Sequence, residues 1–295
     1  MTAVGVIGLG NIGGAIAANL VADGHAVTVS DLDPARVAAI TGAGSGTVRD
    51  VAAVSEVTFT SLPTPEIVTA VATEWASAAA TGSVLVDLST TLPASNQALT
   101  EQLAASGHRF VEAPLTGGAI GAQGRALVFL VGGEDDAVAR VAPLLEQLGR
   151  STFHLGPVGT GTTMKLVNSL LAFACTWSSL EALSLAVSAG IDVRTAVDVV
   201  RTGGASNFFI DRAVEEINGR GRPAQFALGL AAKDAHLIEE VANSSGVSAA
   251  MASALVEVLD DALQRGLGDR DWGDLVVAAE ERSGVQLRIE PKAED

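Results

Sequence analysis

The chain of 295 residues has no tyrosine, one cysteine, four histidines and three lysines among its eighteen basic residues. The single cysteine, Cys175, excludes an internal disulfide bond and any zinc site built from several thiolates. The lack of tyrosine excludes every mechanism that uses a tyrosine hydroxyl as general acid or base. Because the chain has no disulfide to maintain, we expect it in the reducing cytoplasm. We expect no bound metal.

Positive charge is also scarce, since 34 acidic side chains against 18 basic ones give a formal net charge of -16. Such a surface repels the phosphates of nucleic acids and of anionic membranes, so we expect neither as a partner. The one apolar stretch of membrane-spanning length, residues 170–190, carries Glu181 and several hydroxyls. We interpret it as a buried helix. A helix so apolar needs a cover from its own domain or from a second subunit, which indicates a homo-oligomer.

Two kinds of pattern divide the chain. The first half alternates short β-branched runs such as AVGVIG, AVTVSD and SVLVDLS with helical patterns. This alternation predicts an α/β fold, a Rossmann-type doubly wound parallel sheet. After the Gly- and Pro-containing stretch GPVGTG, long helical patterns predominate, which predicts an all-helical second part. We therefore predict a nucleotide-binding domain over residues 1–160 and a substrate and oligomerisation domain over 161–295, beginning with a long inter-domain helix.

A glycine fingerprint, Gly8-Leu-Gly10-Asn-Ile-Gly13, lies between the first expected strand and the first expected helix. In this context the three glycines permit a tight turn, close approach of a pyrophosphate, and packing of helix on strand. The second expected strand ends at Asp31, whose carboxylate suits the ribose hydroxyls of NAD and repels the extra phosphate of NADP. Asp33 is the expected N-cap of the following helix, with Pro34 in its first turn. The intervening residues expected to contact NAD are Asn11 and Ile12.

Polar residues also follow the third and fourth expected strands, in SLP and DLST. In open α/β sheets the carboxyl ends of the strands line the ligand crevice. We therefore expect Leu62, Pro63, Ser89 and Thr90 to lie at the nicotinamide end of NAD. The alternative is that they are ordinary turn residues.

A nucleotide site of this kind indicates an oxidoreductase. The residue types that the chain lacks restrict which side chain can act as its general base. Without tyrosine, the Tyr-Lys chemistry of short-chain dehydrogenases and aldo-keto reductases is excluded. None of the four histidines has a recognisable Asp and Arg setting, so a lysine remains. Lys165 lies in an apolar helical run, GTTMKLVNS, and a buried lysine amine can lose its proton whereas arginine cannot. Asn168, three residues later, shares its helix face.

Four stretches together resemble the β-hydroxyacid dehydrogenase family, which includes 3-hydroxyisobutyrate dehydrogenase and tartronate semialdehyde reductase. These are the glycine fingerprint, EAPLTGG (112–118), GTTMKLVNS and AAKDAHL (231–237). The resemblance implies NAD-dependent hydride transfer at the C3 hydroxyl of a small β-hydroxy acid. It also implies site residues: Thr116, Gly117 and Gly118 for the substrate carboxylate, Lys165 as catalytic base, Asn168 for catalysis and substrate binding, Lys233 for substrate and cofactor, and Asp234 for cofactor.

The residues themselves support this assignment, with two departures from the family pattern. Adjacent glycines expose backbone N–H groups that can cradle a carboxylate, and burial near a cationic nicotinamide should lower the pKa of Lys165. Ser169 stands where many relatives have Asn or Gln, and Arg125 where they usually have glycine. Either Gly124 supplies the turn there, or Arg125 places a cation near the substrate, which would favour a sulfonate or a second carboxylate.

Several alternatives remain open at this point. A tartronate semialdehyde or sulfolactaldehyde-type reductase shares the same motifs, and an imine reductase shares the architecture but usually lacks the lysine. A 6-phosphogluconate dehydrogenase is longer and has a His-Asn pair after its lysine. A noncatalytic nucleotide-binding scaffold has no use for Lys165. We expect Asn207, Phe208 and Phe209 to line the substrate pocket and to determine the size of the substrate.

Overall fold

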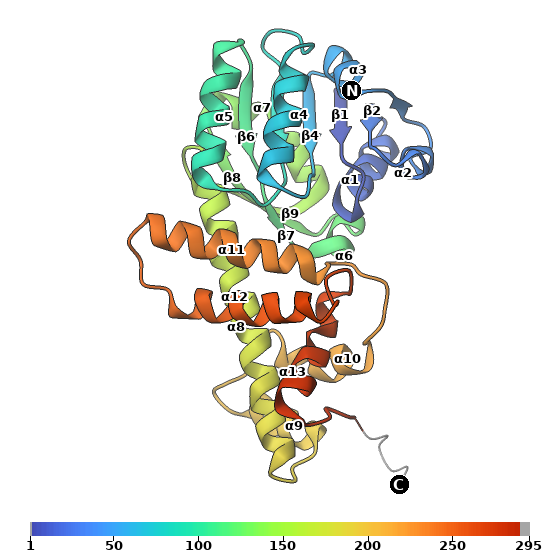
Figure 1. The fold of residues 1–295 in the computed structure, drawn as a ribbon. Coiled ribbons are helices and arrows are strands. Elements are labelled where there is room, and N and C mark those ends of the chain that lie inside the picture. Colours follow the sequence, from blue (N-terminus) through green and yellow to red (C-terminus); the bar gives the residue numbers. More distant parts are fainter. Residues whose placement is uncertain (1, 290–295) are drawn as a thin grey trace. The chain divides into compact units, whose positions relative to one another are not determined.

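A computed structural model describes residues 2–289 and divides into two compact units, residues 1–166 and 167–295. The division falls inside one continuous helix, α8 (Thr160–Ser188). The first unit therefore contains the beginning of α8 as well as a sheet with its covering helices (Figure 1).

The sheet unit alternates strands and helices through most of its length (Figure 1). Its strands are β1 (Ala3–Ile7), β2 (Ala26–Ser30), β3 (Gly44–Ser45), β4 (Val57–Thr60), β5 (Val84–Asp87), β6 (Arg109–Glu112), β7 (Leu115–Thr116), β8 (Leu127–Gly133) and β9 (Gly149–His154). Its helices before α8 are α1 (Asn11–Ala22), α2 (Pro34–Ala39), α3 (Val48–Val54), α4 (Pro65–Ala76), α5 (Pro93–Ala105), α6 (Gly118–Gln123) and α7 (Asp135–Leu148).

The strand order is β3-β2-β1-β4-β5-β6-β8-β7, with β9 paired to β8. The neighbours from β3 to β6 are parallel, which confirms the predicted doubly wound arrangement. β8 differs, because it runs antiparallel to β6. A parallel return needs a crossover, usually a full helix. The link from β6 to β8 holds only the two-residue β7 and the six-residue α6, so the chain turns back instead.

Burial explains why the inner strands read as continuous apolar runs. β4 and β5 are buried at every residue, as parallel strands covered on both faces must be. Trp75 is fully buried and donates its indole N–H to Thr58. The predicted cap of α2 is confirmed, since the Asp33 carboxylate accepts the backbone N–H of Ala35 and Pro34 lies in the first turn.

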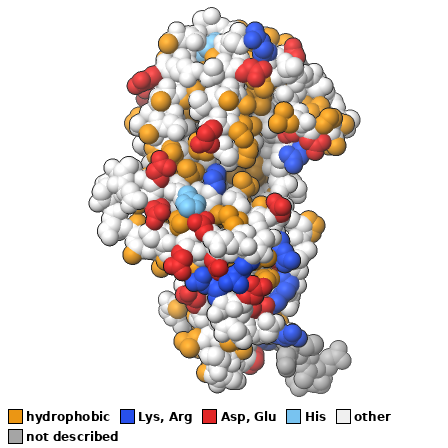
Figure 2. All heavy atoms as spheres, in the orientation of Figure 1, with side chains coloured by type: hydrophobic (Ala, Val, Ile, Leu, Met, Phe, Trp, Pro, Cys, Tyr) orange, Lys and Arg blue, Asp and Glu red, His pale blue; other side chains and the backbone are white. Residues whose placement is uncertain are grey.

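The second unit is all-helical in the part of the chain that the structure describes, which confirms the predicted fold class. Its elements after α8 are α9 (Val193–Thr202), η1 (Ile210–Arg212), α10 (Ala213–Asn218), α11 (Leu228–Ser244), α12 (Ala250–Gln264), η2 (Trp272–Asp274) and α13 (Leu275–Ser283). On its surface, basic and acidic side chains lie next to each other (Figure 2). Arg265, for example, bonds both Asp261 and Glu281.

Helix α8 is long and apolar enough to cross a membrane by length and composition alone. The same helix supplies core residues to the helical unit, since Phe173, Leu180 and Leu183 are buried. Buried core helices of globular domains have this composition too. The apolar composition of α8 therefore also fits a core helix.

Arg125 departs from both expectations for its loop. It adopts the left-handed conformation itself, with φ 55°, while Gly124 has φ -86°. Its guanidinium donates to both carboxylate oxygens of Asp23, at 2.6 and 2.9 Å, and to the carbonyls of Asn19 and Gln147. Asp23 follows the C-terminal end of α1, opposite the glycine fingerprint. These bonds give no support to the alternative of a cation beside the substrate; they join the Arg125 loop to α1 and α7.

Candidate functional site

The glycine fingerprint forms a cradle at the start of α1. Gly8 has φ 87°, and a Cβ there would lie 2.4 Å from the Ser61 carbonyl oxygen. A Cβ on Gly13 would lie 1.9 Å from the Gly8 carbonyl oxygen, so helix and loop approach this closely only because residue 13 is glycine. A Cβ on Gly10 would meet no described atom within 4 Å. Gly10 thus faces open space at a helix N-terminus, as a pyrophosphate site requires.

Asp31 lies beside this cradle, directly after β2. Its Oδ2 accepts the N–H of Leu9 at 2.6 Å, and its Oδ1 accepts the N–H of Asp33 at 2.8 Å. A carboxylate oxygen can accept more than one hydrogen bond, so each retains capacity for a ribose hydroxyl. The carboxylate thereby joins the glycine loop to β2 and remains suited to the ribose of NAD. The only basic group within ion-pair range among the described residues is Arg36, at 3.9 Å.

The loops after β4 and β5 are fixed to each other by a buried carboxylate. Asp87 Oδ1 accepts from the hydroxyls of Ser89 at 2.6 Å and Thr60 at 2.8 Å. The Ser89 hydroxyl in turn accepts the N–H of Leu62 at 2.9 Å. Ser89 is buried and Thr90 is half-buried. The Ser89 hydroxyl therefore shapes both loops, and contacts of Ser89, Thr90, Leu62 and Pro63 with NAD stay predictions.

Asp87 gives the protein a pH-dependent stability. Its burial, together with the nearby Glu112 charge, raises the pKa of Asp87 above its usual 3.8, although hydrogen bonds from Ser89 and Thr60 oppose the rise. Its Oδ2 has no hydrogen-bond partner among the described residues. A raised folded-state pKa stabilises the fold below pH 3.8, and this contribution is lost as pH rises through the raised value.

We expect Asp87→Asn to remove this pH-dependent term. The stability of the variant relative to the native chain should therefore increase as pH rises from about 4 to about 8, because only the native chain must ionise a buried carboxyl. Urea unfolding of both proteins across this range measures the difference. A difference that stays constant with pH would show that Asp87 does not titrate there.

The EAPLTGG segment continues from β6 into an exposed turn. Thr116 ends β7, and both following glycines are left-handed, Gly117 with φ 117° and Gly118 with φ 61°. Both glycines are exposed and Thr116 is half-buried. Successive glycines in this conformation leave backbone N–H groups unobstructed by side chains, and the Thr116 hydroxyl lies next to them. The turn can therefore bind a carboxylate.

Lys165 lies in the second turn of α8 and is half-buried. It belongs to the sheet unit, whereas Asn168, one turn later on the same helix, falls in the helical unit. Their three-residue spacing on a regular helix places them on one face, as expected. Ser169, next to Asn168, is buried and so faces protein.

In the helical unit, α11 carries Lys233 and Asp234. The Lys233 amine lies 2.8 Å from the Asp234 carboxylate, which is almost fully buried. The side chains of Lys233 and Asp234 are therefore in direct contact. This contact fixes the position of the Lys233 amine beside Asp234.

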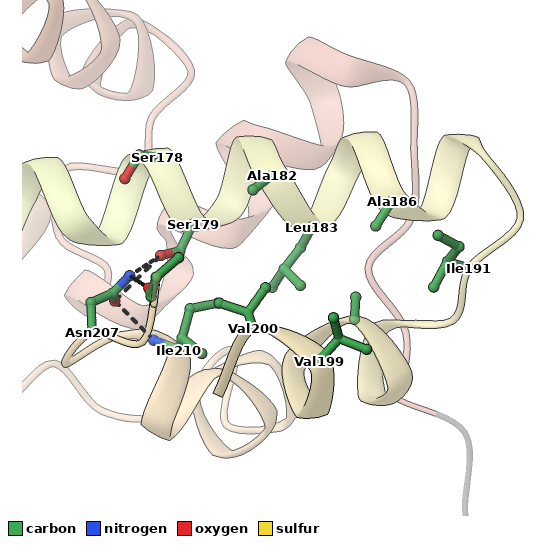
Figure 3. A pocket seen from close by; sticks show the side chains of 12 residues that line it. Ser178, Ser179, Ala182, Leu183, Ala186, Ile191, Val199, Val200, Asn207 and Ile210 are labelled. Atoms are coloured by element: carbon green, nitrogen blue, oxygen red, sulfur yellow. Dashed lines mark hydrogen bonds between the residues drawn. The ribbon is translucent and has the colours of Figure 1, made fainter. Parts of the chain in front are cut away.

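A cavity of about 440 Å³ lies between α8, α9 and the segment before η1 (Figure 3). Its lining is mostly apolar and contains no ionisable side chain. Asn207 turns inward and bonds the Ser179 hydroxyl at 3.1 Å, and its carbonyl oxygen accepts the N–H groups of Phe209 and Ile210. Phe209 is buried and Phe208 is exposed. Asn207 thus shapes this segment, and the cavity offers no group for proton transfer.

Sequence reasoning missed several polar residues beneath these loops. They are Thr60, Asp87, Asn96, Glu112 and Thr162, all fully or almost fully buried. Asp87 and Glu112 end neighbouring strands and pair in register. The signal in the sequence was an acidic residue at the end of a mostly apolar strand, in VLVD (84–87) and in RFVE (109–112). Among residues 2–289, no group of three or more His, Cys, Asp or Glu is arranged to hold a metal ion.

Two family patterns match the chain almost from end to end. Residues 3–156 match the family described as NAD binding domain of 6-phosphogluconate dehydrogenase. Residues 159–278 match the family described as NAD-binding of NADP-dependent 3-hydroxyisobutyrate dehydrogenase.

Individual relatives agree with these matches. The chain is 32% identical to 2-(hydroxymethyl)glutarate dehydrogenase of Eubacterium barkeri over 292 residues, covering 96% of this chain and 97% of the relative. It is 34% identical to 3-hydroxyisobutyrate dehydrogenase of Pseudomonas aeruginosa over 217 residues, covering 72% and 73%. Among solved structures, Mycobacterium tuberculosis 3-hydroxyisobutyrate dehydrogenase with L-serine superimposes with a TM-score of 0.85 at 25% identity, covering 94% of this chain and 98% of that one.

Proposed function

Because this chain belongs to the β-hydroxyacid dehydrogenase family, we propose that it oxidises the C3 hydroxyl of a small 3-hydroxyisobutyrate-like acid, with Lys165 as general acid and base. Members of this family are NAD-binding oxidoreductases that act on the CH–OH groups of hydroxy acids. The glycine cradle and Asp31 fit NAD by their own geometry, since Gly10 faces open space and each Asp31 oxygen can accept a ribose hydroxyl.

One observation carries the proposal. The segment after β6 presents Gly117 and Gly118 as an exposed left-handed turn, and the same sheet unit contains Lys165 at the start of α8. An anion-binding turn and an amine are the two groups that a hydroxy acid needs, one for its carboxylate and one for its hydroxyl proton.

In this proposal the Thr116–Gly118 turn binds the substrate carboxylate, and Asn168 bonds the reacting oxygen. The neutral Lys165 amine accepts the hydroxyl proton, so that the O–H bond breaks as the C3–O bond becomes a carbonyl. Bound NAD would supply the acceptor for the hydride that leaves C3. In the reverse direction Lys165 returns the proton. We assign Lys233 and Asp234 to the binding of cofactor and substrate.

The test is NADH formation with a panel containing 3-hydroxyisobutyrate, glycerate, serine and a sulfonated analogue, with NADP in parallel. Turnover with a β-hydroxy acid supports the proposal and identifies the substrate. Because Arg125 is engaged with Asp23, we expect no advantage for the sulfonate. Binding of NADH without turnover of any hydroxy acid would contradict it.

We expect Asp31→Ala to shift the cofactor preference toward NADP by roughly tenfold or more. The change removes charge-assisted hydrogen bonds to the ribose, each of about 1.5 to 3 kcal/mol, and the repulsion of a 2′-phosphate. The ratio of kcat/KM for the two cofactors measures the shift. Asp33→Ala is the matched control, because Asp33 lies two residues away and caps α2. An unchanged ratio in Asp31→Ala would assign the preference elsewhere.

We also propose a homo-oligomer that uses the helical unit. Large apolar side chains of this unit are exposed: Val167, Leu171, Leu185, Ile191, Val199 and Phe208. A second copy covering them would remove apolar area from water. Analytical ultracentrifugation tests this directly, and a monomer at micromolar concentration would contradict it.

A further inference from the structure

Glu112 ends β6 inside the sheet unit and is fully buried. Its Oε1 accepts three backbone N–H groups from the start of α8: those of Gly159 at 2.7 Å, Gly161 at 2.8 Å and Thr162 at 3.2 Å. Its Oε2 accepts the Thr162 hydroxyl at 2.8 Å and the Asn96 amide at 2.7 Å. One carboxylate therefore receives five hydrogen bonds.

The surroundings of this carboxylate leave it no freedom to move. A Cβ on Gly132 would lie 2.4 Å from Glu112 Oε1, and a Cβ on Gly161 would lie 2.4 Å from the Leu130 carbonyl oxygen. Glycine at position 132 leaves room for the Glu112 carboxylate, and glycine at position 161 lets α8 approach β8 closely. The positive end of the helix and the five donors together offset the desolvation of a buried charge.

The arrangement differs from an ordinary helix cap. Asp192 caps α9 by bonding the N–H of Thr195, three residues later. Glu112 lies 47 to 50 residues before its backbone partners on α8. Glu112 therefore links two separate elements, whereas an N-cap residue such as Asp192 belongs to the end of its own helix. These are the strand that leads into the Thr116–Gly118 turn and the helix that carries Lys165.

We propose that Glu112 is a positioning residue that sets the Lys165 amine relative to the carboxylate-binding turn. Lys165 follows Gly161 by four positions, so in a regular helix its backbone N–H bonds the Gly161 carbonyl. That carbonyl belongs to the same peptide group as the Thr162 N–H, which Glu112 accepts. A shift at Glu112 is thus passed directly to Lys165. This inference rests on the proposed function, because it requires Lys165 to be the base.

The test is Glu112→Gln, which keeps the size of the side chain but removes its charge and turns one acceptor into a donor. We expect kcat/KM to fall roughly 10- to 100-fold, since a misplacement of about 1 Å costs on this order, while NADH affinity stays within about twofold. Because Glu112 would set the surroundings of the Lys165 amine, the pH profile of kcat/KM should change as well. Amide hydrogen exchange at Gly161 and Thr162 should accelerate.

Leu145→Ala is the control for lost stability, because Leu145 is a fully buried core residue of α7 outside the proposed site. It should lower Tm without moving the pH profile. If Glu112→Gln behaves like Leu145→Ala, with lower Tm but native kcat/KM and pH profile, the inference is overturned. If Glu112→Gln does not fold, Thr162→Val removes the hydroxyl that donates to Oε2 and accepts from the Asn96 amide, and leaves the backbone bonds to Oε1 in place. We then expect kcat/KM to fall about threefold; native kcat/KM would overturn the inference.

Lys165→Ala, measured in parallel, separates this inference from the proposed function. Full turnover by Lys165→Ala would remove the base and with it the proposed function. Loss of turnover in Lys165→Ala, with native kinetics in Glu112→Gln, would overturn only the positioning role of Glu112.

Discussion

Replacing Lys165 by alanine is expected to lower kcat by at least about 100-fold while NAD affinity stays nearly unchanged. General base catalysis contributes about this much, and the glycine cradle that binds NAD does not involve the Lys165 side chain. Steady-state kinetics with the substrate from the panel measures kcat, and quenching of intrinsic fluorescence measures NADH affinity.

Lys165→Arg distinguishes a base from a simple cation. Arginine restores the positive charge and most of the length but does not lose its proton at any working pH. We therefore expect Lys165→Arg to be nearly as slow as Lys165→Ala. Recovery of turnover in the arginine variant would show that this position only needs a cation, and the proton acceptor would have to be sought elsewhere.

Replacing Gly13 by alanine is expected to weaken NAD binding by at least about 100-fold and to destabilise the fold by about 1 to 3 kcal/mol, as overpacking does. The new Cβ would lie 1.9 Å from the Gly8 carbonyl oxygen and 3.2 Å from the Ser61 Cβ. The start of α1 must therefore move away from the loop that receives the pyrophosphate. Isothermal titration with NADH and urea unfolding measure the two effects.

Gly10→Ala is the matched comparison for Gly13→Ala. Its Cβ meets no described atom within 4 Å, so the protein without NAD should tolerate it. The methyl group projects into the space that a pyrophosphate would occupy, so NADH binding should still be lost. Native-like NADH affinity in Gly13→Ala would mean that α1 accommodates the methyl group without disturbing the cradle.

The sequence predicted those features that neighbouring residues determine. The glycine cradle, the Asp33 cap and the parallel strands through β6 all follow from short patterns with a known period or spacing. The direction of β8 did not follow, because its apolar run reads the same in either direction. Only the shortness of the link through α6 decides it.

Long-range partners explain the rest. The guanidinium of Arg125 binds Asp23, which is 102 residues away, and no local pattern shows that pairing. Glu112 is the first residue of the EAPLTGG motif, but the sequence indicates a role only for the last three residues of that motif. Its partners lie near Asn96 and at the start of α8, so its role emerges only when strand and helix are brought together.

The hydrogen bonds of Glu112 also determine where the protein can be cut and rejoined. A fragment ending at residue 160 would remove the N–H groups of Gly161 and Thr162 and the Thr162 hydroxyl, leaving a buried charge with too few donors. A sheet unit that is to be combined with another helical unit must therefore extend past the Gly- and Pro-containing stretch into α8, as far as the division between Leu166 and Val167. Chimeras that give this sheet unit a relative's helical unit should be joined inside α8, beyond Lys165, so that Lys165 and Glu112 come from the same parent protein.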